Sequence, residues 1–396
     1  MRMIKEKIKQ AFDILKEEEI DCWLTFVRES STTHDPAMDI VVGTNVTWHS
    51  AFIITAKGDS IAIVGSLDKA NQEAHGYYDR IIGYVKSIEN DLISTIEQIN
   101  PNKIAINYSL NSPTADGITH GMYLQLKQYI KKTSFLDRLI SSEAILNKLR
   151  GRKSRTELEC VKNAIDLTIK LFQRVDDFMK VGKSEKEVAA FLIDCVDKEG
   201  VELAWDPLHC PAVFTGPDTA GAHAGPTDRK IQHGHVLNID FGIKKDDYCS
   251  DLQRSWYFLH PGETSAPPEV KHGFQVIYDS ISAAAAALKP GVKGCDIDDI
   301  ARSFIKDHGY DEFPHALGHQ IGRAAHDGGG LLAPEWERYG RLPYQTVEKN
   351  QLYTLEPRLT IQDYGIATIE EIVLVTDDGC EFLSPRQKEI YLVHSD

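Results

Sequence analysis

The chain has 396 residues, which exceeds the size of one ordinary hydrophobic core, so its length predicts two domains. Its composition, with 42% hydrophobic and 26% charged residues, is typical of a globular protein rather than a fibrous or disordered one. The formal net charge of −15 argues against nucleic-acid binding, because phosphate recognition needs a basic surface.

The N-terminus, MRMIKEKIKQAF, is charged from its first residues and has no apolar stretch of the kind found in signal peptides. No apolar run reaches the length of a membrane-spanning helix. Seven cysteines are scattered along the chain without a C-x-x-C pair. Such a pattern is typical of reduced thiols. We therefore expect a cytoplasmic protein that does not associate with membranes.

The first third of the chain alternates between helix-like and strand-like runs. Apolar side chains recur at helical spacing near the start, at Ile4, Ile8, Phe12 and Leu15. Strand-like sequences follow at 22–27 and at 51–65, where a turn at 57–59 predicts a hairpin. Alternation of strands and helices through about residue 135 predicts a compact α/β domain, which we bound at residues 1–145.

In the remainder of the chain, 146–396, helices and strands do not alternate regularly as they do in the first domain. The charged stretch 149–159 leads into an apolar helical face, which predicts a long helix. The sequence predicts further helices at 184–199, 268–288 and 296–308. It predicts strands at 234–241, 247–258, 351–361 and 364–376. Because several of these strands follow one another as hairpins, we expect an α+β domain here.

Carboxylates lie within the apolar strand-like runs of this second domain. Asp240 lies in VLNIDFG, and Asp251 follows eleven residues later in YCSDLQRSW. A buried carboxylate requires a partner, so its presence in a strand is informative. If the two runs form a hairpin around a turn at 244–247, both carboxylates can face the same side.

Three more metal-binding side chains follow in the same region: His319, Glu356 and Glu370. Each alone is more often a surface or structural residue. Together with the two aspartates they form an oxygen-rich set, which suits Mn²⁺, Co²⁺, Fe²⁺ or Zn²⁺ in a two-metal site.

The motifs in order are D-F-G, S-D-x-x-R, G-H-x-I-G, E-P and I-E-E. This order resembles the pita-bread metallopeptidases, and most of all their aminopeptidase P and prolidase branch. The resemblance implies an α/β N-terminal domain at 1–145 and an α+β pita-bread catalytic domain at 146–396. It also implies a homodimer, a small peptide substrate and hydrolysis of Xaa-Pro bonds by a metal-bridged hydroxide.

The resemblance assigns a role to each candidate ligand. Asp240 resembles the bidentate ligand of one metal ion, and Asp251 and Glu370 resemble bridging carboxylates. His319 resembles the single imidazole ligand of the second ion. Glu356 resembles a ligand that also handles the proton of the attacking water. Two divalent ions are therefore expected, Mn²⁺ first, with Co²⁺, Zn²⁺ or Fe²⁺ as alternatives.

Three further histidines match positions that bind substrate and stabilise the tetrahedral intermediate in that branch: His223, His315 and His326. A slot for the proline ring needs apolar side chains. Candidates to line it are Phe214, Trp336, Tyr339 and Tyr344. The segment 328–345, which carries three of them, is expected to form a lid, a dimer contact or an ordinary surface loop.

Two positions depart from the branch. Thr368 lies where an arginine is common, and Arg358 lies where a small residue is usual. Arg358 is either a surface residue or a positive charge for a substrate carboxylate. The departure at Thr368 keeps one alternative open, a hydrolase of another amide or C–N substrate. A creatinase-like enzyme without metal and a non-catalytic binding module are disfavoured, because all five candidate ligands are present.

Overall fold

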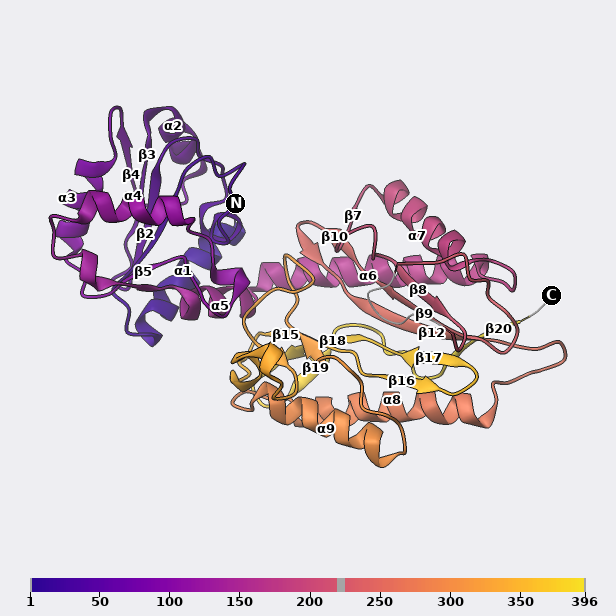
Figure 1. Cartoon of the computed structure of the whole chain (residues 1–396). Coiled ribbons are helices and arrows are strands. Elements are labelled where there is room, and N and C mark those ends of the chain that lie inside the picture. Colours follow the sequence, from indigo (N-terminus) through magenta and orange to yellow (C-terminus); the bar gives the residue numbers. More distant parts are fainter. Residues whose placement is uncertain (1, 219–224, 395–396) are drawn as a thin grey trace. The chain divides into compact units, whose positions relative to one another are not determined.

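The computed structural model describes residues 2–218 and 225–394, which form two compact units, Met1–Arg150 and Gly151–Asp396 (Figure 1). The expected boundary after residue 145 lies within helix α5 (Glu143–Gly151). Three side chains of α5, Ile145, Leu146 and Leu149, belong to the core of the N-terminal unit. The chain therefore leaves this unit at the end of the helix.

The N-terminal unit is built on one six-stranded sheet in the order β4-β3-β2-β1-β5-β6. Its strands are β1 (Cys22–Val27), β2 (Ser50–Thr55), β3 (Ser60–Gly65), β4 (Arg80–Tyr84), β5 (Ile104–Ile106) and β6 (Leu139–Ser141). The predicted hairpin at 51–65 is confirmed as the antiparallel pair β2–β3. The pairs β3–β4, β1–β5 and β5–β6 are parallel.

Helices cover both faces of this sheet, because its strands are apolar on both sides. Helix α1 (Arg2–Glu17) packs with Trp23 and Phe52 on one face. Helices α3 (Glu89–Ile99) and α4 (His120–Ile130) pack on the other. The short helix α2 (Ser66–His75) follows β3.

The C-terminal unit contains the predicted long helices. They are α6 (Arg155–Phe178), α7 (Glu185–Glu199), α8 (Pro268–Ala287) and α9 (Gly294–Asp307). Capping boxes begin the first two, from Ser154 with Glu157 and from Ser184 with Glu187. Ser154 therefore sets where the long helix starts, within the stretch in which it was expected. Within this unit, α6 and α7 lie on one side of the strands and α8 and α9 on the other (Figure 1).

The strands between these helix pairs form short sheets, antiparallel among the described residues except for one parallel pair between Leu252–Phe258 and Tyr391–Val393. The first group is β7 (Glu202–Leu203), β8 (Ala212–Thr215), β9 (Val236–Phe241), β10 (Ile243–Lys245), β11 (Tyr248–Cys249) and β12 (Leu252–Phe258). The second is β13 (Gly318–His319), β14 (Leu331–Leu332), β15 (Leu352–Leu355), β16 (Arg358–Ile361), β17 (Gly365–Thr368), β18 (Glu371–Val375), β19 (Cys380–Phe382) and β20 (Tyr391–Val393). One large apolar cluster joins α8 and α9 to the second group.

The predicted hairpin around residues 244–247 is confirmed. Asp246 and Asp247 both have positive φ, at 51° and 65°, and form the two-residue turn between β10 and β11. Beyond it β9 and β12 pair antiparallel, with Asp240 opposite Gln253. Since side chains alternate along a strand, Asp251 lies on the same face as Gln253 and therefore as Asp240.

The two strands predicted at 351–361 and 364–376 are each broken, so that prediction was wrong in length. The first divides into β15 and β16 around Glu356 and Pro357, and the second into β17 and β18 around Glu370. Pro357 has no N–H to donate to a ladder. Glu356 instead donates its N–H to Leu317 O at 2.8 Å, and Glu370 donates to Gln253 O at 3.2 Å. Both glutamates thus lie where strands change sheets.

Among the described residues, the helices lack the combination of length and apolarity that a membrane crossing requires. All seven cysteines are free thiols.

Candidate metal centre

Candidate ligands from four separate segments meet at the junction of these sheets. Single ligand atoms of Asp251, His319 and Glu370 lie within 4.8 Å of one another, and all three residues are buried. Glu356 joins them, because its Oε1 is 3.3 Å from Nε2 of His319. Asp240 joins through a side-chain contact with Asp251. The hairpin and the two strand breaks therefore bring the five predicted residues together.

The local structure around His319 explains why it is preceded by glycine. Strand β13 pairs with β14, and Gly318 lies so close to the Thr354 carbonyl that a Cβ atom would overlap it. Thr354 also accepts the His319 N–H through Oγ1 at 3.1 Å. A larger residue at 318 would push His319 away from the carboxylates.

The His319 ring is oriented with one nitrogen toward the backbone and the other toward the carboxylates. Nδ1 is 3.3 Å from the Gln320 carbonyl oxygen, which only accepts, so Nδ1 carries the proton. Nε2 lies on the other side of the ring, 3.7 Å from Asp251 Oδ2 and 3.3 Å from Glu356 Oε1. A ring held by one nitrogen to a carbonyl, with the other exposed to carboxylates, is the arrangement of metal-binding histidines.

The donor set fits divalent cations. Asp240 Oδ1 and Glu370 Oε1 are buried and make no hydrogen bond within residues 2–218 and 225–394. Such buried anionic oxygens are costly unless a positive charge compensates them. Four carboxylates and one imidazole suit hard to borderline divalent ions.

The crowding of these groups shifts their proton affinities. Burial, together with the charge of Glu356, raises the pKa of Asp240 to about 7. Burial and the neighbouring carboxylates raise the pKa of Asp251 and of Glu370 well above the ordinary range. Burial opposes ionisation of Glu356 as well, but the hydrogen bond and charge of His319, with His315 and His326, lower its pKa. Glu356 is therefore the carboxylate that stays ionised most readily.

Two of the other predicted histidines lie beside this centre, and the third, His223, lies outside the described residues. The His326 ring stands edge-on to that of His319, with centroids 4.2 Å apart. His315 donates Nδ1–H to the Ala316 carbonyl at 2.8 Å. Burial lowers its pKa, although Glu356 raises it. A neutral His315 held in this way presents Nε2 as an acceptor.

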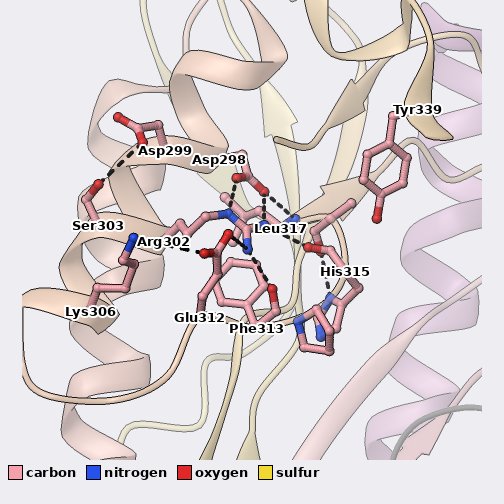
Figure 2. Close-up of polar contacts among 12 residues, drawn as sticks. Asp298, Asp299, Arg302, Ser303, Lys306, Glu312, Phe313, His315, Leu317 and Tyr339 are labelled. Atoms are coloured by element: carbon pink, nitrogen blue, oxygen red, sulfur yellow. Dashed lines mark hydrogen bonds and ion pairs between the residues drawn. The ribbon is translucent and has the colours of Figure 1, made fainter. Parts of the chain in front are cut away.

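A second polar cluster holds the segment from which His315 extends (Figure 2). Arg302 on α9 donates to both oxygens of Asp298, with Nε 2.7 Å from Oδ2 and Nη2 2.9 Å from Oδ1. It also donates to the carbonyls of Phe313 at 2.6 Å and His315 at 2.8 Å. Asp298 Oδ1 accepts the Leu317 N–H at 2.9 Å. We call this pair the Asp298–Arg302 clamp.

The clamp was not found from the sequence. Asp298 and Arg302 lie at i and i+4 on a predicted amphipathic helix, a spacing common to surface ion pairs. Their burial, with side chains 1% and 6% exposed, is what distinguishes them. Leu317 O in turn accepts the Glu356 N–H, so the clamp connects to the candidate metal centre through one backbone step.

Gln253 is a third residue of this region that was not found from the sequence. Its Nε2 donates to Glu370 Oε2 at 3.0 Å and to Glu356 Oε2 at 3.3 Å. Thr368 donates Oγ1–H to Gln253 Oε1 at 2.8 Å. Its position two residues after Asp251, and hence on the same strand face, was the available signal.

The residues suggested for a proline slot are dispersed. Phe214 on β8 is opposite Asn238, on the face that also carries Asp240. Trp336 and Tyr339 stack on each other at 6.0 Å, and Trp336 lies 5.0 Å from the Arg302 guanidinium. Tyr344 is 44% exposed. Part of the segment 328–345 therefore packs on the clamp.

Comparison with known proteins agrees with this architecture. The family model described as metallopeptidase family M24 matches residues 159–377. An uncharacterized peptidase of Staphylococcus haemolyticus is 28% identical over 340 residues, 85% of this chain and 88% of that protein. The structure of an X-Pro aminopeptidase from Thermotoga maritima is 24% identical, has a TM-score of 0.71, and is matched over 98% of this chain and 99% of that one. An Xaa-Pro dipeptidase from Bacillus anthracis gives 22% identity and a TM-score of 0.74 over 98% and 100%.

Fold and family together define the class: a two-unit pita-bread hydrolase of the peptidase type, as the motifs predicted. The chain belongs to metallopeptidase family M24. Members of that family use divalent metal ions, and the buried carboxylate cluster is the candidate site for them.

Proposed function

We propose that this protein is a dinuclear metal-dependent exopeptidase that cleaves Xaa-Pro bonds. The observation that carries the proposal is the contact of His319 Nε2 with two buried carboxylates, beside oxygens of Asp240 and Glu370 that make no hydrogen bond within residues 2–218 and 225–394. The relatives in the comparisons support the substrate class, since two structures of similar fold are named for X-Pro and Xaa-Pro peptide bonds.

In this proposal Asp240, Asp251, His319, Glu356 and Glu370 hold two divalent ions, with Mn²⁺ as the first candidate. When bound, such ions supply an acidified water molecule and polarise the scissile carbonyl. Mn²⁺ fits the oxygen-rich donor set, and Co²⁺, Zn²⁺ and Fe²⁺ are the alternatives.

The chain's own groups would then move the protons and hold the substrate. Glu356, whose pKa is lowered by His319, is suited to accept a proton from water and pass it to the leaving nitrogen. His315 presents an acceptor nitrogen, so in its neutral form it would receive a hydrogen bond from a substrate N–H. Phe214 shares the sheet face of Asp240 and would contact the proline ring.

Arg358 bears on the choice between dipeptides and longer peptides. It pairs with Thr368 across β16 and β17, so both side chains leave the same face of the ribbon, and Thr368 reaches Gln253 in the candidate centre. The positive charge of Arg358 contributes to the lowered pKa of His315. We propose that Arg358 favours substrates with a carboxylate near the scissile bond.

The direct test combines metal analysis with a substrate panel. Protein reconstituted with Mn²⁺ should bind two ions per chain and hydrolyse Xaa-Pro dipeptides or Xaa-Pro-Yaa peptides. Preference for dipeptides identifies dipeptidase activity, and preference for longer peptides identifies aminopeptidase activity. Protein that retains no stoichiometric metal and leaves the whole panel intact would contradict the proposal.

A hydrolase of another amide or C–N bond is the alternative, and hydrolysis of such compounds with an intact Xaa-Pro panel would select it. A creatinase-like enzyme without metal would turn over after chelation, and a binding module would turn over nothing. We further propose a homodimer, to be checked by light scattering. The seven free thiols support a cytoplasmic location as a proposal.

A further inference from the structure

The side chain of Gln253 contacts two candidate metal ligands, although it cannot itself be a strong ligand. It is 7% exposed and lies on the sheet face of Asp240 and Asp251. Its Nε2 bonds Glu370 at 3.0 Å and Glu356 at 3.3 Å. One amide therefore bridges the two glutamates that come from different strand breaks.

The direction of this amide is set by a second contact. Thr368 donates its hydroxyl proton to Gln253 Oε1 at 2.8 Å. An ionised carboxylate only accepts, so the opposite orientation of the amide would place Oε1 against two anionic acceptors. Thr368 and the two glutamates thus require the same orientation, with both N–H groups directed at the carboxylates.

The backbone reinforces the same geometry. The Glu370 N–H donates to Gln253 O at 3.2 Å, and Asp240 lies opposite Gln253 in the β9–β12 pair. Gln253 therefore fixes Glu370 through both its main chain and its side chain. Glu356 is fixed by the same amide and by its N–H bond to Leu317.

The amide of Gln253 is an uncharged donor, which matters for the net charge of the carboxylate cluster. An arginine is common at position 368 in the branch that the sequence resembles, and this chain has Thr368 there. A guanidinium would add a permanent positive charge to the group of carboxylates. The amide supplies two N–H bonds without adding that charge, so it orients the two carboxylates without forming an ion pair with them.

We propose that Gln253, oriented by Thr368, is a positioning residue that holds Glu356 and Glu370 for divalent ions in place of a charged side chain. This inference rests on the proposed metal centre. It assigns to the Gln253–Thr368 pair a role in metal affinity that is separate from peptide recognition.

The test replaces the amide without changing its length. Gln253→Met removes both N–H donors and keeps an unbranched side chain of similar size. Titration calorimetry with Mn²⁺ should show affinity weakened by about 10- to 100-fold, as is usual when a group supporting metal ligands is lost. Thr368→Val keeps the shape of the side chain but frees the amide to rotate, so its loss should be smaller. In the cobalt-loaded protein, both variants should alter the visible absorption of Co²⁺.

Gln387→Met is the matched control, because Gln387 is also a buried amide beside β12 but bonds the backbone of Ser255. It should leave the affinity for Mn²⁺ within twofold of the wild type. For the peptidase reaction, Gln253→Met should lower kcat at saturating Mn²⁺ with little change in KM, because substrate contacts are preserved.

The outcomes separate the inference from the proposed function. Wild-type protein that binds metal, with Gln253→Met and Thr368→Val both binding it as tightly, overturns the inference and leaves the metal centre intact. Wild-type protein that binds no metal overturns both. If Gln253→Met does not fold, Thr368→Val decides: weaker binding supports the inference and unchanged binding overturns it.

Discussion

The Asp298–Arg302 clamp and the candidate metal centre both bury carboxylates within the C-terminal unit. In the clamp, Arg302 neutralises Asp298 by two short bonds and uses its remaining donors on backbone carbonyls. In the candidate metal centre, Asp251 and Glu356 instead face the imidazole of His319, which is charged only when it is protonated and is therefore not a permanent cation. Two sites in the same unit thus bury the same chemical group for opposite purposes.

The clamp and the candidate metal centre also differ in what their buried carboxylates contribute to stability. A carboxylate whose oxygens are all paired contributes to the rigidity of the backbone around it. A carboxylate with an unpaired buried oxygen, as in Asp240 and Glu370, costs stability until a cation compensates it. The following variants test whether the two regions differ in this way.

The largest effect is expected from Asp251→Asn. Removal of one anionic oxygen from the middle of the cluster should abolish turnover and prevent binding of two ions, because the amide is a poor bridging ligand. The number of metal ions bound per chain and the rate of hydrolysis of an Xaa-Pro peptide measure these two losses. Asp299→Asn, the same change at an exposed position of α9, is the control and should be active. Full activity in Asp251→Asn would refute the ligand assignment.

Arg302→Met should instead act on stability. It leaves Asp298 charged and buried without its partner, which costs about 3–5 kcal/mol. Urea denaturation measures the free energy of unfolding. Arg155→Met removes an exposed pair with Glu159 and should cost less than about 1 kcal/mol. If the two variants are equally stable, Arg302 does not clamp this segment.

Removal of metal ions should lower the melting temperature of the wild-type protein. Returning Mn²⁺ to a concentration 100 times its Kd should restore about 2.7 kcal/mol for each site. Differential scanning calorimetry before and after chelation provides the comparison. A folded Arg302→Met variant should keep this gain, whereas Asp251→Asn should lose most of it. Equal gains in both variants would show that the stabilising ions bind elsewhere.

The smallest effect is expected at Arg358. Arg358→Ala should raise KM for an Xaa-Pro dipeptide by about tenfold, since a charge-assisted hydrogen bond to the substrate carboxylate is lost. KM for the corresponding Xaa-Pro amide should change little. Arg358→Lys keeps the charge and should recover part of the affinity. Identical changes for dipeptide and amide would assign Arg358 to the structure rather than to the substrate.

The secondary structure was largely predictable because it depends on local signals. The spacing of apolar residues gave α7, α8 and α9, and the turn residues Asp246 and Asp247 marked the hairpin. The strand breaks at Glu356 and Glu370 were not predicted, since both runs remain apolar through the break. Their backbone partners, Leu317 and Gln253, are distant in sequence.

The sequence by itself determined which residues could form a metal centre, because the order of the motifs and the types of residue can be read without a structure. Asp240, Asp251, His319, Glu356 and Glu370 were chosen on that basis, and the tertiary structure brings them together. Only the tertiary structure decided how they are held. The roles of Gln253 and Arg302 depend on burial and on hydrogen bonds between segments up to 117 residues apart, which no local pattern records.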